Sequence, residues 1–275
     1  MEIFQNLPVT FAGIDKVFEV SNYIDLGFTT VRWYGAIIAF GFTLAVLFGG
    51  RTAYVWKINL DKMIDVLLYG TVSAIIGARL YYVAFAWDDY KNNLIDIFKI
   101  WEGGLAIYGG LIVGTLTVFI CCKIKKLSFY KLGDAVVPGV MIGQLLGRWG
   151  NFFNGEAYGG IVAEDSPLYF LRMGLSPHDF YELRGQMAYV HPTFLYESVW
   201  CAIGFIILYR HFKNRKFRGE MLCMSGAWYG FGRFFIEGLR TDSLYIAGTQ
   251  IRTSQALSAA IVIVCSIMLV VLLIK

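Results

Sequence analysis

The chain has 275 residues, of which 57% are hydrophobic and 16% are charged. An average soluble domain has roughly 25% charged residues, so this composition excludes an ordinary soluble enzyme and indicates several membrane crossings. The formal net charge of +4 becomes informative only when the basic residues are assigned to the sides of a membrane.

Residues 1–30 carry acidic side chains and lack the apolar core and cleavage pattern of a signal peptide, so the first apolar run is expected to insert the chain and stay. A membrane-spanning helix needs about 20 predominantly apolar residues. We predict seven spans, over residues 31–50, 63–86, 104–122, 132–152, 194–209, 219–238 and 254–274. The predicted fold is an all-α integral membrane protein without internal repeats, with residues 1–275 forming a single domain.

Three short basic segments, 51–62, 123–131 and 210–218, follow alternate spans and therefore lie on one face of the membrane. The positive-inside rule makes that face cytoplasmic, which places the N-terminus outside and the C-terminus in the cytoplasm. The long polar insertion over 153–193 then projects outward, where it is expected to act as a lid or a peptide-docking element.

Small residues recur at four-residue spacing in three predicted spans: Ala135, Gly139, Gly143 and Gly147; Gly110 and Gly114; Gly226 and Gly230. Such stripes allow helices to approach closely in lipid, and tight packing is their expected role. The five cysteines have no metal-ligand spacing with the histidines, one of which is His178. No phosphate-binding loop, serine triad or dinucleotide fingerprint is present, so we predict no metal, no cofactor and no nucleic acid partner.

The end of the fourth predicted span carries polar residues at membrane depth. The run over 147–159 reads GRWGNFFNGEAYG and contains Arg148, two amides and a carboxylate. Charged residues inside a membrane are costly and usually mark function. Because the charge is an arginine among glycines, which allow a close approach, the run predicts an anionic partner.

Further polar residues fall on the same outer side, namely Tyr34, Arg79, Tyr108, Asn151 and Arg233. Tyr229, Arg233 and Glu237 are spaced to share a helix face, and Arg240 follows three residues later. The planar fork of arginine suits bidentate contact with phosphate. Together these residues predict a site for the headgroup of an outer-leaflet phospholipid.

Each charged residue also has a structural interpretation. Arg233 and Glu237 could form a buried ion pair, Arg148 could close a helix end with Glu156, and Arg79 could reach the outer headgroups. His191, at the start of the fifth span, could act as a base or be structural. Glu197, on the same segment, is expected to anchor a hydrogen-bond network.

Several motifs resemble those of the bacterial phosphatidylglycerol–prolipoprotein diacylglyceryl transferase family. They are GRWGNFFNGE over 147–156, RWYG over 32–35, the double glycines at 103–104 and 109–110, HPT with LYE over 191–197, and Tyr229-Gly230 with Arg233 and Glu237. The resemblance implies a seven-span enzyme of the bacterial cytoplasmic (inner) membrane whose active site faces the outer leaflet. Such an enzyme transfers the diacylglyceryl group of phosphatidylglycerol to the lipobox cysteine thiol of a preprolipoprotein. A thioether forms and glycerol phosphate leaves, in the first step of lipoprotein biosynthesis.

The resemblance also implies roles for individual residues. Arg148 and Arg233 would bind the phosphate and stabilise its growing charge. The headgroup site would be shaped by Asn151, Asn154, Glu156 and Gly159. Tyr34 and Tyr229 would position the headgroup or the thiol, Glu237 would orient Arg233, and Arg240 is a further phosphate ligand.

Tyr108 stands where many family members have a histidine that is proposed to activate the thiol. Tyrosine has a pKa of about 10 and is a poor base unless its environment is strongly perturbed. Nearby arginines could shift it, it could merely position the cysteine, or another group such as His191 could take the proton. Positioning is the favoured interpretation.

The sequence is less typical of two other functional classes. A transporter or flippase for an anionic lipid or solute would use the arginines only to bind, but neither an inverted repeat nor an inner-side arginine cluster is found in the sequence. An assembly protein would not need so many buried polar groups at one depth.

Overall fold

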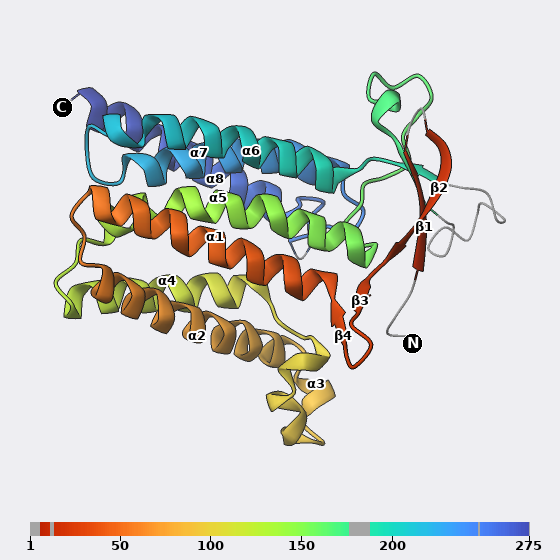
Figure 1. The fold of residues 1–275 in the computed structure, drawn as a ribbon, viewed down its shortest axis with the longest axis horizontal. Helices are drawn as coiled ribbons and strands as arrows, with labels where there is room; N and C mark the ends of the chain where they lie inside the picture. The colour runs from red at the N-terminus through yellow and green to blue at the C-terminus, as the bar shows by residue number, and fades with distance from the viewer. Residues whose placement is uncertain (1–5, 12–13, 176–187, 247, 275) are drawn as a thin grey trace. The chain divides into compact units, whose positions relative to one another are not determined.

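The computed structural model describes residues 6–11, 14–175, 188–246 and 248–274. All seven predicted spans are helices, named α1 (Trp33–Val55), α2 (Leu60–Phe85), α4 (Ile107–Ile124), α5 (Phe129–Asn154), α6 (Thr193–His211), α7 (Glu220–Leu239) and α8 (Thr253–Ile274) (Figure 1). A short helix, α3 (Trp87–Tyr90), and 3-10 turns over Leu94–Phe98 and Ile100–Glu102 follow α2. The prediction of a mainly helical chain is confirmed.

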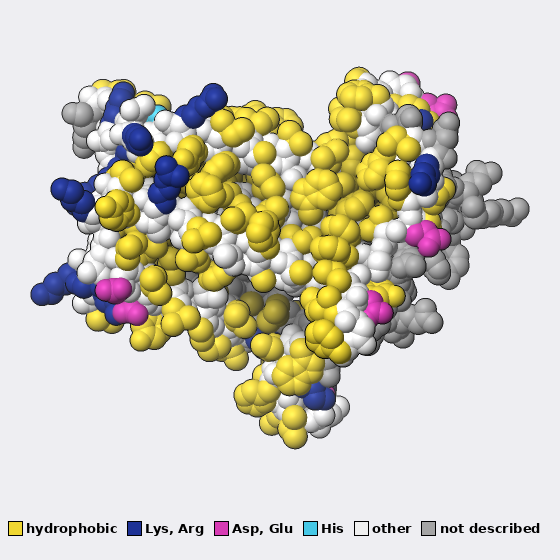
Figure 2. Space-filling view, viewed as in Figure 1, with side chains coloured by type: hydrophobic (Ala, Val, Ile, Leu, Met, Phe, Trp, Pro, Cys, Tyr) yellow, Lys and Arg dark blue, Asp and Glu magenta, His cyan; other side chains and the backbone are white. Residues whose placement is uncertain are grey.

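Five of the long helical segments have the length and apolarity needed to cross a membrane: α1, α2, α4, the segment Thr193–Asn214 that contains α6, and α8. Exposed hydrophobic side chains cover the sides of the helices (Figure 2). Helices α5 and α7 are also long, but they carry the charged residues of the candidate site. A multi-pass membrane protein is therefore supported, and the crossing of α5 and α7 stays a prediction.

The structure also contains strands, which the all-α prediction did not include. β1 (Asn6–Phe11), β2 (Ile14–Ser21), β5 (Met173–Leu175) and β6 (Ala188–Val190) form an antiparallel sheet in the order β2-β1-β5-β6. A second pair, β3 (Tyr23–Asp25) and β4 (Thr30–Arg32), leads into α1. The four-stranded sheet joins the start of the chain to the insertion over 153–193, a long-range pairing that periodicity alone does not reveal.

The chain divides into two compact units, Gly50–Ala135 and the remainder. In the Gly50–Ala135 unit, α2 and α4 touch through glycines. A Cβ atom at Gly77 would lie 2.8 Å from the carbonyl oxygen of Gly109, and one at Gly114 would lie 2.9 Å from the Ala74 side chain. The close packing predicted for the third span is confirmed.

Arg79 stabilises the loop that follows α3 in the same unit. Its guanidinium donates to the carbonyl oxygens of Asp96, Ile97, Gly103 and Gly104 at 2.6–3.0 Å, and the side chain is 6% exposed. The interpretation that Arg79 reaches out to lipid headgroups is therefore wrong, because its donors are used on the backbone.

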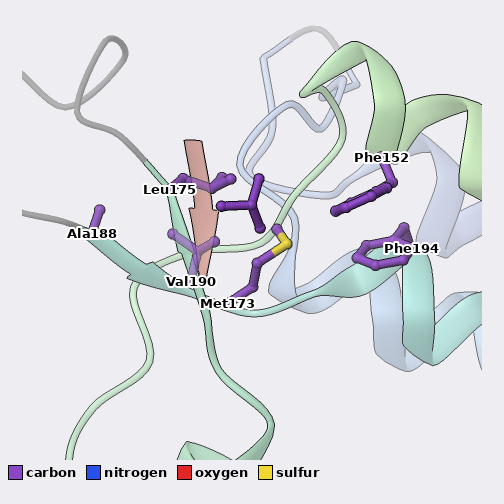
Figure 3. Packing of buried hydrophobic residues seen from close by; sticks show 7 residues of the cluster. Phe152, Met173, Leu175, Ala188, Val190 and Phe194 are labelled. Atoms are coloured by element: carbon purple, nitrogen blue, oxygen red, sulfur yellow. The ribbon is translucent and has the colours of Figure 1, made fainter. Parts of the chain in front are cut away.

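In the other unit, glycines of α5 and α7 meet neighbouring helices. A Cβ atom at Gly139 would lie 2.5 Å from the Ala45 carbonyl oxygen on α1, and one at Gly230 would lie 3.0 Å from that of Ser258 on α8. An apolar cluster joins the sheet to α5 and α6 (Figure 3), and its members are Val9, Phe152, Met173, Leu175, Ala188, Val190 and Phe194. The described part of the insertion thus packs on the ends of the helices that carry the candidate site.

Candidate functional site

Charged residues of three helices meet at one buried carboxylate. Glu197, in the second turn of α6, is only 1% exposed. Its Oε1 lies 2.7 Å from Nη2 of Arg148 on α5, and its Oε2 accepts from Nη1 of Arg233 on α7 at 2.9 Å. One carboxylate therefore holds two arginines that come from different helices.

Tyr229 and Glu237 complete the group from α7. The Tyr229 hydroxyl donates to Oε1 of Glu197 at 2.9 Å and accepts from Nη2 of Arg148 at 3.4 Å. Glu237 forms an ion pair with Nη2 of Arg233. We call these five residues the arginine–glutamate cluster. Their contacts confirm the common helix face predicted for Tyr229, Arg233 and Glu237.

The cluster is electrically balanced, since two guanidinium groups face two carboxylates and the formal charges sum to zero. A guanidinium has five N–H donors, more than these pairs use. Within the described residues, Nε and Nη1 of Arg148 have no hydrogen-bond partner, and its side chain is 20% exposed. Arg148 therefore keeps donors that an anionic ligand can use while Glu197 holds the rest of the group.

Neighbouring residues fix α5 against α6 beside the Arg148–Glu197 pair. The Trp149 indole donates to the Ser198 hydroxyl at 3.1 Å, and that hydroxyl donates to the Leu145 carbonyl at 3.2 Å. Trp149 directly follows Arg148, and Ser198 directly follows Glu197. These bonds therefore help to set the distance between the two charged groups.

Gln144 lies one helical turn before Arg148 on α5 and shares its face. Its Oε1 is buried and has no hydrogen-bond partner in the part of the chain that the structure describes. Buried polar atoms nearly always have partners, so an unpaired amide near this cluster marks a place for a ligand or a water molecule. No motif in the sequence pointed to Gln144.

Tyr34, Asn151 and Arg148 come from adjoining parts of α1 and α5. The Tyr34 ring lies so close to Gly150 that a Cβ atom there would be 2.8 Å from it. Asn151 is three residues after Arg148, and its carbonyl accepts from the Glu156 backbone N–H at 3.0 Å. The structure thus places Tyr34 and Asn151 beside the α5 segment that carries Arg148.

Asn154 and Glu156 form a separate contact at the end of α5. The Asn154 amide donates to Oε1 of Glu156 at 3.3 Å. Arg148 pairs with Glu197, and no ion pair joins it to Glu156 among the described residues. The structural interpretation that paired Arg148 with Glu156 is wrong, while the predicted roles of Asn154 and Glu156 toward a headgroup stay predictions.

Gly159 holds the start of the insertion against α6 and α7. Its N–H donates to the His191 carbonyl at 2.9 Å, and a Cβ atom at this position would lie 2.9 Å from the Leu239 carbonyl oxygen. Only a residue without a side chain fits between these two backbones. The structure therefore gives Gly159 a packing role, and its contact with a headgroup stays a prediction.

Arg240, just after α7, is engaged by a carboxylate of its own. Its Nε and Nη2 donate to the two oxygens of Asp242 at 2.8 and 2.5 Å. Partial burial works to raise the pKa of the Asp242 carboxyl, but these bonds hold that pKa below its ordinary value. Asp242 thus stays ionised and neutralises Arg240, which leaves Arg240 a weaker phosphate candidate than Arg148.

Neither the His191 nor the Tyr108 side chain takes part in the contacts described above. The Nδ1 atom of His191 lies 3.3 Å from the Tyr196 hydroxyl, and burial lowers the pKa of this histidine, which favours its neutral form. Tyr108 is in the first turn of α4, in the Gly50–Ala135 unit. The roles of both residues in proton transfer stay predictions, and His178 lies outside the described residues.

Glu197 was expected only to anchor a hydrogen-bond network, and that expectation is confirmed. The sequence marked it through its place in the run 191–197, which sets a carboxylate close to His191. The number of residues between Glu197 and either Arg148 or Arg233 does not reveal that they are in contact, because the three residues come from different helices. Its place at the centre of the site was therefore missed.

Comparisons with known proteins agree with these features. The family described as "Prolipoprotein diacylglyceryl transferase" matches residues 21–271. Three relatives carry the name phosphatidylglycerol–prolipoprotein diacylglyceryl transferase. The chain is 45% identical to the one from Listeria monocytogenes EGD-e over 240 residues, which cover 87% of this chain and 85% of the relative. It is 46% identical to that of Clostridium kluyveri (85% and 89% covered) and 43% identical to that of Staphylococcus aureus Newman (89% and 88% covered).

Proposed function

The chain belongs to the prolipoprotein diacylglyceryl transferase family, and from this premise we propose that it transfers the diacylglyceryl group of phosphatidylglycerol to the lipobox cysteine of a preprolipoprotein. The sulfur of the cysteine attacks the glycerol carbon that bears the phosphate. An S–C bond forms, the C–O bond to the phosphate breaks with its electron pair, and glycerol phosphate leaves. The arginine–glutamate cluster carries this proposal, since it offers guanidinium donors at membrane depth. The relatives' names favour this reaction over transport or flipping of a lipid.

The proposed setting is the bacterial cytoplasmic membrane, crossed by all seven long helices. On this arrangement α5 and α7 span the membrane because their charged residues neutralise one another inside the protein, which lowers the cost of burial. The basic link between α6 and α7 faces the cytoplasm, so the cluster and the sheet lie toward the outer leaflet. Phosphatidylglycerol and the preprolipoprotein both reach the site from that side.

The two arginines act on the leaving group. The phosphate of phosphatidylglycerol carries one negative charge, and a second develops on the oxygen that leaves. Arg148 uses its unpaired Nε and Nη1 donors, while Glu197 and Glu237 keep both guanidinium groups in place. Donors held ready where charge develops stabilise a transition state more than the ground state. Loss of one such donor lowers kcat roughly a hundredfold or more.

The substrate thiol must lose its proton before it attacks. Either a protein group accepts this proton, or the site shifts the thiol–thiolate equilibrium toward the thiolate. A free cysteine has a pKa near 8.5, so a small fraction is thiolate at neutral pH. On our proposal Tyr108 positions the thiol and the arginines favour its ionised form. His191, which burial keeps neutral, is the alternative acceptor.

Reconstitution of the protein with phosphatidylglycerol and a lipobox peptide tests the function directly. Mass spectrometry should show a peptide that has gained one diacylglyceryl group, and its absence with folded protein would contradict transfer. Arg148→Ala should lower the rate roughly a hundredfold or more, a loss out of proportion to the loss of folding that follows from breaking its ion pair with Glu197. Arg210→Ala, at an exposed position in the last turn of α6, is the matched control and should keep the wild-type rate. Near-normal turnover of Arg148→Ala would rule out its phosphate role.

A further inference from the structure

Three polar residues form one stripe along α5. Gln144, Arg148 and Asn151 follow one another at spacings of four and three residues, so their side chains leave the same face of the helix. The member of the stripe that lies furthest from the sheet is Gln144, about 6 Å along the helix axis from Arg148. It belongs to the apolar run 132–152, where a buried polar group without a partner is costly.

Contacts on both sides of Gln144 show that this part of α5 faces α6. A Cβ atom at Gly204 of α6 would lie 2.9 Å from Cε of Met141, which is three residues before Gln144. Arg148, four residues after Gln144, pairs with Glu197 of α6. Gln144 therefore lies between two points at which the helices meet, one helical turn from the Arg148 donors that stay available.

The amide oxygen of Gln144 is buried and makes no hydrogen bond. Its Oε1 atom is shielded from solvent and has no donor in the part of the chain that the structure describes. The guanidinium of Arg148 donates to Glu197 and Tyr229, and none of its described contacts is with this oxygen. Buried oxygens nearly always have a donor, so the missing donor belongs to a molecule that enters the site.

The missing partner has a definable chemistry. The oxygens of a phosphate diester only accept hydrogen bonds and an acyl chain makes none, so neither satisfies the buried oxygen. A hydroxyl both donates and accepts, and it can therefore pair with either end of an amide. An ammonium group also donates, but it would bring another positive charge into apolar surroundings one helical turn from Arg148. A neutral hydroxyl that is close to a phosphate group fits best.

We propose that Gln144 binds a hydroxyl of the glycerol headgroup of phosphatidylglycerol while Arg148 binds the phosphate of the same lipid. This inference rests on the proposed function and adds the residue that selects the headgroup. The hydroxyls of that headgroup lie on the carbons that follow the phosphate ester, which suits a binding residue one helical turn from the guanidinium. The headgroup keeps these hydroxyls when it leaves as glycerol phosphate. Gln144 therefore binds the ground state and the transition state alike, and its loss should raise KM more than it lowers kcat.

Removal of the hydroxyls from the lipid, and of the amide from the protein, tests this pairing. The protein is reconstituted in phosphatidylcholine vesicles with equal amounts of phosphatidylglycerol and phosphatidylpropanol, whose headgroup has no hydroxyl. Both lipids donate the same diacylglyceryl group, and deuterated acyl chains in one of them separate the two peptide adducts by mass. The adduct ratio then reports the relative kcat/KM. The wild-type protein should favour phosphatidylglycerol by at least about threefold, the value of one hydrogen bond.

Gln144→Leu should reduce that preference by about threefold to tenfold, because only the reaction of phosphatidylglycerol loses a hydrogen bond. Gln144→Met keeps the length of the side chain without its amide and should have the same effect. The matched control is Gln250→Leu in an exposed loop, which should keep the wild-type preference. Rates measured with phosphatidylglycerol alone should show the loss mainly as a higher KM.

An unchanged preference in a folded, active Gln144→Leu or Gln144→Met variant would overturn the headgroup contact and leave the transferase function intact. Equal use of the two lipids by the wild-type protein would also overturn it, and is the result expected if only a water molecule meets the amide. If the wild-type protein forms an adduct from neither lipid, the proposed function fails and the headgroup contact fails with it.

Discussion

The carboxylate of Glu197 lies 2.7 Å from Nη2 of Arg148 and so joins α6 to α5 inside the apolar part of the chain. This contact means that Arg148, which we propose binds the phosphate, is not an isolated positive charge. It is held at one edge by a buried carboxylate, while its remaining donors stay available. Glu197 therefore orients the Arg148 guanidinium before any ligand binds, and a ligand has only to contact the remaining donors.

Glu197→Gln tests whether the carboxylate fixes the arginines. The amide keeps the size of the side chain but removes the charge that balances Arg148 and Arg233. Breaking a buried ion pair typically costs about 3–5 kcal/mol, so we expect a clear fall in thermal stability together with a fall in kcat. Thermal unfolding by intrinsic fluorescence and initial rates with saturating phosphatidylglycerol measure the two effects.

The matched control for that variant is Glu164→Gln, an exposed position in the described part of the insertion. It should retain both the stability and the rate of the wild-type protein. If Glu197→Gln matches this control in both measurements, Glu197 does not anchor the cluster.

Much of the helical architecture was predictable because lipid imposes a simple rule on sequence. Each span must be an apolar run of sufficient length, and all seven predicted runs are helices. The pairing of β1 with β5 was not predictable, since these strands are short and distant in sequence. Nothing in their local pattern specifies a partner.

In the candidate site, too, contacts within one helix were predictable from the sequence and contacts between helices were not. Tyr229, Arg233 and Glu237 share one helix, so their common face followed from spacing alone. The choice of Glu197 over Glu156 as the partner of Arg148 depends on how α5 packs against α6, which spacing within one helix does not specify. Long-range packing was therefore the missing information.

Gln144→Leu is expected to separate stability from catalysis. Removing a buried amide oxygen that lacks a partner costs the fold little, and an apolar group of similar shape is neutral or stabilising. If the amide binds substrate, kcat/KM should fall about threefold to tenfold, the value of one hydrogen bond. The melting temperature and kcat/KM for phosphatidylglycerol are measured on the same preparation. Unchanged kcat/KM would remove Gln144 from the site, and Gln250→Leu in an exposed loop is the control.

Tyr108→Phe examines the residue that departs from the family pattern. If the ring only positions the cysteine thiol, loss of the hydroxyl should leave most of the activity, because the ring keeps its shape and place in α4. Tyr108→His should also be active if, as the family resemblance implies, this position accepts a histidine. Rates of adduct formation with a lipobox peptide measure both variants. A loss of roughly a hundredfold or more in Tyr108→Phe would show instead that the hydroxyl carries the proton.

His191 gives the protein a stability that depends on pH. Burial lowers the pKa of His191 below the ordinary value of about 6.5, so the unfolded chain binds a proton there more readily than the folded protein. As the pH falls below about 6.5, protonation of the unfolded chain reduces the stability of the fold, and above that range the effect vanishes. His191→Gln lacks this titration. Between about pH 8 and pH 5, the melting temperature of the wild-type protein should fall more steeply than that of the variant.

Tyr196→Phe is the companion variant, because it removes the hydroxyl that lies 3.3 Å from Nδ1 of His191 while leaving the histidine to titrate. Its melting temperature should keep the wild-type dependence on pH. Parallel curves for the wild-type protein and His191→Gln would show that the imidazole is not buried in its neutral form.

Adduct formation by His191→Gln at pH values above about 6.5 answers the separate question of catalysis. A rate close to that of the wild-type protein there leaves the thiol proton to a different acceptor, because the amide of glutamine cannot take it.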